Sequence, residues 1–243
     1  MESQSLHCKE ELELIILLKE LRSILESAIN SLAHQTPPSI DSRYIVHAAK
    51  AINFASDSYI FLREAGKVHT SKMMIRPMIE TVTTAIAVEK NKGYFFRVAY
   101  TELQKAKKLY DATPENNAKA KEEEERLKMS FSREPNYPIV LKQIDAKVTA
   151  DAAGLAVVYR SAYAIYCEFT HNALRAINGD LDEATDHIDT LMVIWAVEVM
   201  LNQLKKFTPA VIPDLSAFNA RVQKAQDAMF KIYDKPAGPA LWT

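Results

Sequence analysis

The chain has 243 residues, of which 48% are hydrophobic and 25% are charged, close to the averages of globular proteins. This composition excludes a chain that is disordered or fibrous as a whole, and the length allows one large domain. Thirty basic side chains against 31 acidic ones leave a net charge of -1. No strong overall field therefore attracts nucleic acid or an anionic membrane, and such a partner would need a local basic patch.

Glycine is scarce, with five residues in 243, and more than twenty positions separate any two of them. Loops that cradle phosphates need several glycines within one turn, so that backbone N-H groups can approach the ligand. The sequence therefore excludes a Rossmann fingerprint and a P-loop. The same scarcity argues against many β-hairpins, which use glycine at positive φ.

The sequence shows neither a secretory signal nor a stretch that could span a membrane. No basic region precedes a long apolar stretch near the N-terminus, and the longest uncharged stretches in the helical body span eight residues. A membrane-spanning helix needs about 20 apolar residues. We therefore expect a cytoplasmic protein that makes no contact with a membrane.

Residues 5–34 are predicted to form one long helix. Apolar residues recur at alternating spacings of four and three, which is the period of a coiled-coil seam: Leu14, Leu18, Leu21, Leu25, Ala28 and Leu32. This stripe has two interpretations. Either it packs inside the chain's own bundle, or it forms part of a subunit interface, and for that reason we expect a homodimer.

Further helices are predicted along the rest of the chain. Residues 41–65 begin at Asp41 as N-cap and stop at Gly66, and Pro77 must lie in the first turn of the next helix or kink it. The full series of ranges is 41–65, 71–91, 93–110, 114–129, a short helix from 139, 151–177, 185–207 and 213–233. These patterns predict an all-α, single-domain helical bundle of about eight or nine helices over residues 1–234, followed by a tail at 235–243.

Polar residues in apolar helical surroundings are the candidate site. Arg76 and Glu80 are four residues apart, Glu198 lies within a nearly apolar helix, and Arg160 shares a predicted helical face with His171, which Asn172 follows. One interpretation is structural, with Arg76 paired to Glu80 or another glutamate and His171 hydrogen-bonded in the core. The other is an interhelical polar pocket in which an arginine grips a phosphate or carboxylate and His171 acts as general acid or base.

Residues 90–110 combine basic side chains with aromatic ones. Arg97, Lys105 and Lys108 are the candidates for contact with single-stranded RNA, through phosphate contacts and base stacking. The alternative is an ordinary basic helix face. The acidic residues between Asp180 and Asp189 fit no known metal-binding spacing, so we expect neither a metal nor another cofactor.

Two segments resemble the prokaryotic helical domain family DUF 5677, over residues 45–205. They contain Arg76, residues 78–80, Tyr159, Tyr163, Tyr166 and residues 169–171. That family is similar to the HEPN group, several of which are metal-independent RNases with an arginine followed four to six residues later by histidine. The one literal match to this spacing here is Arg63 and His69.

The resemblance implies a helical binding or regulatory protein of a prokaryotic or mobile-element system, with antiviral defence as one setting. Its pocket would contain Arg76, Glu80, Arg160, His171, Asn172 and Glu198. The alternative is a HEPN-like RNase, with His171 as acid and base and Arg76 or Arg160 on the phosphate. The expected partners are a second copy of the chain, another protein or RNA.

Overall fold

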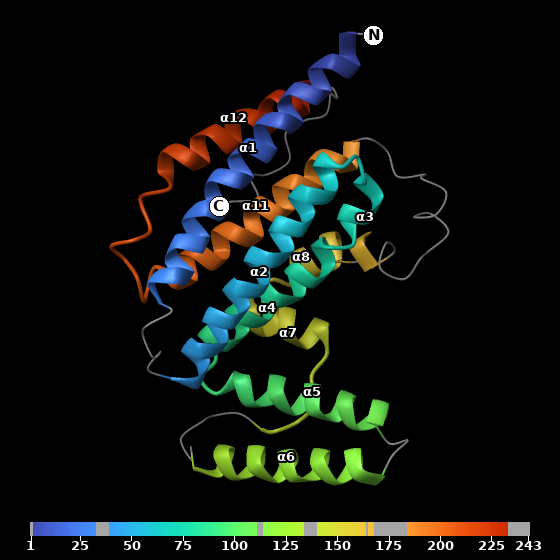
Figure 1. Cartoon of the computed structure of the whole chain (residues 1–243), viewed down its shortest axis with the longest axis vertical. Coiled ribbons are helices and arrows are strands. Elements are labelled where there is room, and N and C mark those ends of the chain that lie inside the picture. The colour runs from blue at the N-terminus through green and yellow to red at the C-terminus, as the bar shows by residue number, and fades with distance from the viewer. Residues whose placement is uncertain are drawn as a thin grey trace.

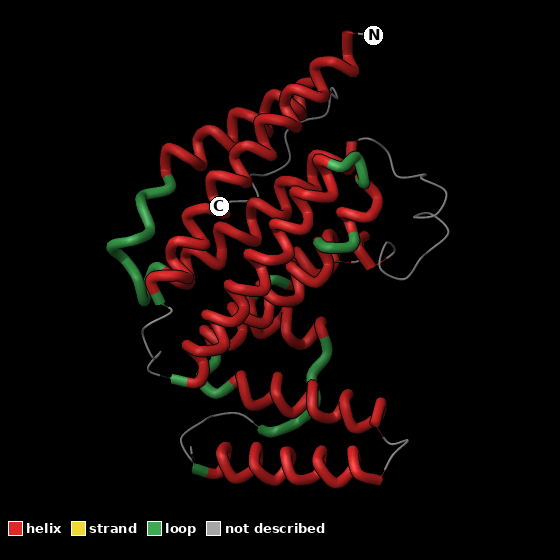
Figure 2. The backbone as a smooth tube through the Cα atoms, viewed as in Figure 1, coloured by secondary structure: helices red, strands yellow, loops and turns green. Residues whose placement is uncertain are grey.

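The computed structural model describes residues 2–32, 39–110, 114–133, 140–163, 165–167 and 184–232. Within these ranges every regular element is a helix and no β-strand occurs (Figure 2). The chain is thus an all-α protein, as its sequence predicts, and its arrangement is consistent with a single-domain bundle.

Four helices form the centre of the bundle: α1 (Glu2–Ser31), α2 (Ile40–Glu64), α4 (Ile75–Lys90) and α11 (Ala184–Leu204). Helix α11 contacts each of the other three, and α12 (Ser216–Ile232) lies beside α1 (Figure 1). Seven consecutive residues of α11, Leu191–Val197, are buried. This burial on all sides explains why α11 is apolar nearly all round.

The heptad stripe of α1 is buried within the chain's own bundle. Leu14, Leu18, Leu21 and Leu25 have no exposed surface, and the stripe ends at the buried Leu32. The first of the two interpretations of this stripe therefore holds. A subunit interface, if one exists, lies on another surface.

Helix α2 begins and ends with local capping contacts. Its N-cap is Ser39, whose Oγ accepts a hydrogen bond from the Ser42 N-H at 3.0 Å, so the expectation that Asp41 is the N-cap is wrong. Asp41 instead lies in the first turn, where a carboxylate is stabilised by the helix dipole. At the other end Gly66 has a φ of 69°, a left-handed conformation that glycine adopts without strain, and it ends the helix as predicted.

The predicted helix at 71–91 is divided in two. A short helix, α3 (Val68–Lys72), precedes α4, and Pro77 is the third residue of α4. Pro77 therefore lies in the first turn, where its missing N-H leaves no intrahelical hydrogen bond unmade.

Helices α5 (Tyr94–Tyr110) and α6 (Pro114–Ser132) form a hairpin at one end of the bundle (Figure 1). Ion pairs at the predicted i,i+4 spacing occur on α6, from Arg126 to Glu122 at 2.7 Å and from Lys128 to Glu124 at 2.9 Å. Glu124 also accepts a 2.7 Å hydrogen bond from Lys107 of α5, which connects the two helices.

The segment after α6 differs from its prediction. Residue 139 lies outside the described residues, and residues 140–145 are not helical. The first described helix after α6 is α7 (Ala146–Ala153), because Asp145 is its N-cap and accepts from the Val148 N-H at 2.7 Å. The continuous helix predicted at 151–177 is also wrong at its start, because Gly154 ends α7 with a φ of 75°. The chain continues through α8 (Ala156–Val158) into a π-helix, Tyr159–Tyr163.

Candidate functional site

A pocket of about 380 Å³ lies between α4, α5, α7 and the π-helix. Its volume falls at the lower end of the range for small-molecule sites, which is roughly 300 to 1,000 Å³. The lining residues that carry polar side chains are Arg76, Glu80, Thr83, Thr84, Thr101, Glu102, Lys105, Asp145, Thr149, Tyr159 and Tyr163.

The position of α7 below α4 is fixed by contacts to its C-terminus. Lys90 donates a 2.8 Å hydrogen bond to the Ala153 carbonyl, and the Asn91 side chain donates to the Ala152 carbonyl at 3.1 Å. These donors satisfy carbonyl groups that have no partner within the helix, and the charge of Lys90 opposes the negative end of the helix dipole. The floor of the pocket is therefore attached directly to the end of α4.

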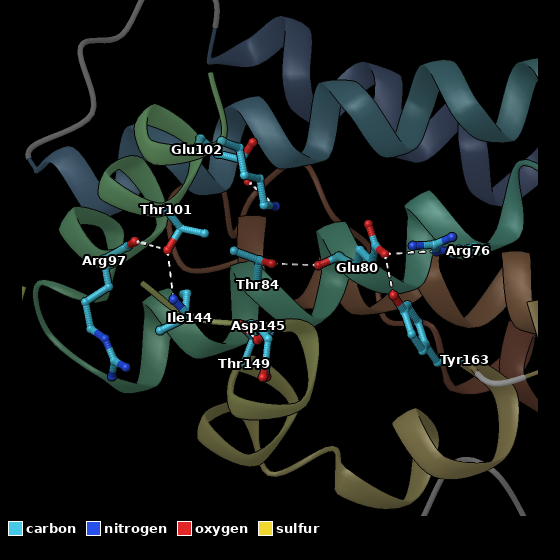
Figure 3. Close-up of polar contacts among 11 residues, drawn as sticks. Arg76, Glu80, Thr84, Arg97, Thr101, Glu102, Ile144, Asp145, Thr149 and Tyr163 are labelled. Atoms are coloured by element: carbon cyan, nitrogen blue, oxygen red, sulfur yellow. Dashed lines mark hydrogen bonds and ion pairs between the residues drawn. The ribbon is translucent and has the colours of Figure 1, made fainter. Parts of the chain in front are cut away.

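One oxygen of Glu80 joins two walls of the pocket. Its Oε1 accepts from Arg76 Nε at 3.1 Å, one turn earlier on α4, and from the Tyr163 hydroxyl at 2.8 Å (Figure 3). The two donors come from different elements, since Tyr163 ends the π-helix. This carboxylate thus connects α4 to the π-helix.

The guanidinium of Arg76 also lies over the ring of Tyr163, at 5.4 Å from its centroid. The Tyr159 ring stacks on Tyr163 with centroids 4.7 Å apart and an interplanar angle of 19°. Both rings belong to the π-helix and are four residues apart, so they lie on neighbouring turns. The result is a layered group of one cation and two aromatic rings beside the pocket.

The titration of this group follows from its surroundings. Burial, followed by the hydrogen bond to the Glu80 carboxylate, raises the pKa of the Tyr163 hydroxyl, so it stays protonated and donates. Burial alone would lower the pKa of Arg76, but its hydrogen bond to Glu80 and the electrostatic interactions with Tyr163, Cys167 and Glu80 together outweigh this, and the pKa is raised. Arg76 is therefore a permanent cation and Tyr163 a neutral donor.

The opposite wall of the pocket comes from α5 and the start of α7 (Figure 3). The Thr101 hydroxyl donates to the Arg97 carbonyl at 2.8 Å and accepts from the Ile144 N-H at 2.9 Å, which fixes the segment before α7 against α5. Lys105 donates to Glu102 at 2.8 Å. Asp145 is exposed and uses one oxygen as the cap of α7.

The charges in the lining do not balance. Three carboxylates, Glu80, Glu102 and Asp145, face two cations, Arg76 and Lys105, so the lining carries one net negative charge. Each cation already has a carboxylate partner, Glu80 or Glu102. In the described part of the chain Asp145 makes no ion pair, and it supplies the excess charge.

The sequence-predicted site residues are only partly brought together. Arg76 and Glu80 form an ion pair, as the structural interpretation expects, and both line the pocket. Arg160 is exposed, its Nε donates to the Ala156 carbonyl at 3.3 Å, and it is not part of the lining. Glu198 lies on α11 and accepts a 2.8 Å hydrogen bond from Asn219 of α12, away from the pocket.

His171 and Asn172 lie outside the residues that the structure describes. The single helical face expected to carry Arg160 and His171 is interrupted before it reaches that region, because the π-helix at Tyr159–Tyr163 changes the angular spacing of side chains.

Of the residues expected to contact RNA, Lys105 lines the pocket and Lys108 is exposed on α5. Arg97 lies over the ring of Tyr94, with its guanidinium 5.2 Å from the centroid. Tyr94 and Phe96 are buried. These two aromatic side chains therefore belong to the core and offer no stacking surface to a base.

A buried polar cluster was not predicted from the sequence. Lys72 and Asp189 have side chains that are 1% and 2% exposed and form an ion pair at 3.3 Å, and Tyr166 donates to Asp189 at 2.7 Å. Close by on α11, Thr190 forms a 2.9 Å hydrogen bond with Tyr59. The signal in the sequence is Asp189, an acidic residue directly before the apolar run of α11.

The fold and the pocket define a helical protein with a polar cavity between its helices, and no helix of the described residues is long and apolar enough to cross a membrane. A family of unknown function, DUF5677, matches residues 41–188, more than half of the chain. The chain therefore belongs to the DUF5677 family. No curated protein and no solved structure matches it.

Proposed function

We propose that this chain is a binding protein whose interhelical pocket takes a small organic cation, such as an amine. The observation that carries the proposal is the excess of carboxylates in the lining, with Asp145 as the charge that no lining cation neutralises. An anion would have to approach three carboxylates, whereas an ammonium group gains a partner.

The other lining groups suit the same class of ligand. The hydroxyls of the lining threonines can accept hydrogen bonds from ammonium N-H groups, which have no acceptor of their own. The Tyr159 ring lies in the wall, and aromatic faces attract ammonium groups. This proposal replaces the expected grip of Arg76 on a phosphate or carboxylate, since the Arg76 guanidinium already has Glu80 as its carboxylate partner through Nε.

We extend the proposal to a regulatory role in a prokaryotic or mobile-element system, with antiviral defence as one setting. That setting is what the resemblance to this family and to HEPN proteins implies. Ligand binding in the pocket would set the position of the π-helix relative to α4, because Glu80 and Tyr163 connect the two elements. A partner protein that contacts this region would then sense the ligand.

A thermal-shift experiment on the full chain tests the pocket, with putrescine, glycerol and inorganic phosphate as the cationic, neutral and anionic probes. We expect putrescine to raise the melting temperature and phosphate to leave it unchanged. Asp145→Asn keeps a good N-cap residue but removes the charge, so it should abolish the putrescine shift. Asp151→Asn, at an exposed position on the same helix, is the matched control. Stabilisation by phosphate alone would overturn the proposal.

RNA cleavage is the second candidate function. The observation in its favour is that Arg76, which lies within the segment matched by the DUF5677 family, lines a pocket with 18% of its side chain exposed. The test is cleavage of labelled single-stranded RNA and tRNA in EDTA, with His171→Ala as the variant. Metal-independent cleavage that a folded His171→Ala chain has lost would establish the nuclease; cleavage that the variant retains would exclude His171 as its acid and base.

A further inference from the structure

Helix α2 exposes two large aromatic side chains on its outer face. Phe54 is 74% exposed and Phe61 is 70% exposed, and their spacing of seven places them on one side of the helix. The buried stripe of α2, which includes Ile45, Ile52 and Tyr59, faces the bundle on the other side. Exposed aromatic pairs of this kind mark interaction surfaces more often than scattered single residues do.

The residues between and beside the two phenylalanines are small. Ala51, Ser58 and Ala65 alternate with Phe54 and Phe61 at spacings of three and four along the same face. We call these five residues the α2 outer face. Such an alternation of small and large side chains allows another helix to approach closely and to receive the rings between its own small residues.

Charged residues follow one edge of this face at intervals of seven: Lys50, Asp57 and Glu64. Two of them are held by α1 through exposed ion pairs, Asp57 with Arg22 at 2.9 Å and Glu64 with Lys19. These pairs fix the position of the edge relative to α1. Lys50 is exposed and makes no ion pair within the described residues.

The midpoints of the aromatic pair and of the outer charge pair lie half a residue apart along α2. Phe54 and Phe61 are centred between residues 57 and 58, and Lys50 and Glu64 are centred on residue 57. A two-fold axis near residue 57 would place a second α2 antiparallel to the first. Phe54 of each copy would then lie near Phe61 of the other, and Lys50 of each near Glu64 of the other.

From this symmetry we propose that the α2 outer face is the contact between two copies of this chain in a homodimer. A self-complementary patch is what an isologous interface requires, whereas an unrelated partner would not need the two midpoints to lie so close together. The Asp57 side chains meet at the axis, and the Arg22 partner of each reduces their repulsion. The buried stripe of α1 offers no competing surface.

Sedimentation velocity of the full chain over micromolar concentrations tests this interface. We expect a mass near twice 27.4 kDa for the natural sequence. Phe54→Gln combined with Phe61→Gln removes only exposed rings, so the chain should stay folded while the dimer dissociation constant rises at least about 100-fold. The matched control is Val140→Gln with Val157→Gln, which replaces side chains that are 72% and 70% exposed elsewhere. This control should remain dimeric.

A charge exchange tests the orientation of the two copies. Lys50→Glu places like charges at both ends of the contact and should weaken the dimer by at least about tenfold. Adding Glu64→Lys, together with Lys19→Glu to keep an ion pair between positions 19 and 64, should restore it, since each new glutamate at position 50 then meets a new lysine at position 64. A natural chain that is monomeric, a phenylalanine double variant that dimerises as tightly as the natural chain, or a charge exchange that fails to restore the dimer would each overturn the proposal.

Discussion

Tyr163 and Glu80, 83 residues apart in the sequence, are joined by a 2.8 Å hydrogen bond from the tyrosine hydroxyl to Oε1 of the carboxylate. The same oxygen accepts from Arg76, so the tyrosine and the arginine share one acceptor. Because its raised pKa keeps the phenol protonated at neutral pH, the hydroxyl donates there. This bond is a direct polar contact between α4 and the π-helix in the pocket wall.

Tyr163→Phe should lower the free energy of unfolding by about 1.5 kcal/mol or more, since a hydrogen bond to a charged acceptor is lost and the ring is kept. Urea unfolding of the full chain measures the difference. Tyr159→Phe is the control, because the Tyr159 hydroxyl makes no hydrogen bond in the described part of the chain. Equal losses in the two variants would show that the contact with Glu80 contributes nothing.

Glu198→Gln should stabilise the chain at neutral pH. Burial raises the pKa of Glu198, and the hydrogen bond from Asn219 opposes this only in part. A raised folded-state pKa means that the folded protein binds the proton more tightly than the unfolded chain does. The contribution of Glu198 to stability is therefore lost as the pH rises from the ordinary pKa of a glutamate through the raised pKa of the folded state. Glutamine accepts the same hydrogen bond without a charge.

The measurement for Glu198 is the free energy of unfolding at several pH values between acid and neutral. The natural chain and Glu198→Gln should converge at the acid end and separate as pH rises. A Glu198→Gln variant that is less stable than the natural chain at neutral pH would contradict the conclusion that burial disfavours the charged form of Glu198.

The contribution of Glu124 to stability should change with pH in the direction opposite to that of Glu198. Hydrogen bonds from Lys107 and then Lys128 lower its pKa to about 2. A depressed folded-state pKa contributes stability that is present above the ordinary value, near 4.5, and is lost as pH falls toward about 2. We therefore expect α6 to separate from α5 in acid before the central bundle unfolds.

Hydrogen exchange along α6 as a function of pH measures this separation. Glu124→Gln should increase exchange in α6 already at neutral pH, because the contact with Lys107 of α5 is weakened. The control is Glu125→Gln, whose carboxylate is 68% exposed and pairs with Lys128 on its own helix. If hydrogen exchange in α6 is unchanged in Glu124→Gln, the ion pair between Lys107 and Glu124 does not hold α6 to α5.

Lys72→Met should be among the most damaging changes in the chain. It leaves the buried Asp189 without its ion-pair partner, and breaking a buried pair from one side costs about 3 to 5 kcal/mol. Adding Asp189→Asn removes the isolated charge and keeps an acceptor for Tyr166, so most of the stability should return. Lys67→Met, at an exposed position, should change little. A double variant no more stable than Lys72→Met would contradict this explanation.

The parts of the fold that the sequence predicts are those with long periodic patterns or a single strong stop signal. The apolar stripe from Leu14 to Leu32 and the apolar run of α11 are each long enough to predict a buried helix without knowing which helices pack against it. Gly66 ends a helix as expected, because a left-handed residue is required there. The N-cap of α2 was missed because Ser39 and Asp41 are both good cap residues and only the backbone distinguishes them.

The site was predictable only where its contacts are local. Arg76 and Glu80 are one turn apart, so their pairing follows from helical spacing alone. Tyr163 reaches Glu80 through two features with weak sequence signals, a helix stop at Gly154 and a π-helix that ends at Tyr163. The ion pair between Lys72 and Asp189 joins helices that are far apart in the sequence, and the spacing of apolar residues does not predict such a contact.

Isothermal titration of spermidine into the full chain tests the central claim, that the pocket binds an organic cation through its excess carboxylate, most directly. We predict one binding site per chain, an affinity that falls with added salt, and a loss of at least about tenfold in Asp145→Asn but not in Asp151→Asn. Equal affinity in Asp145→Asn and the natural chain, or displacement of spermidine by inorganic phosphate, would contradict the account.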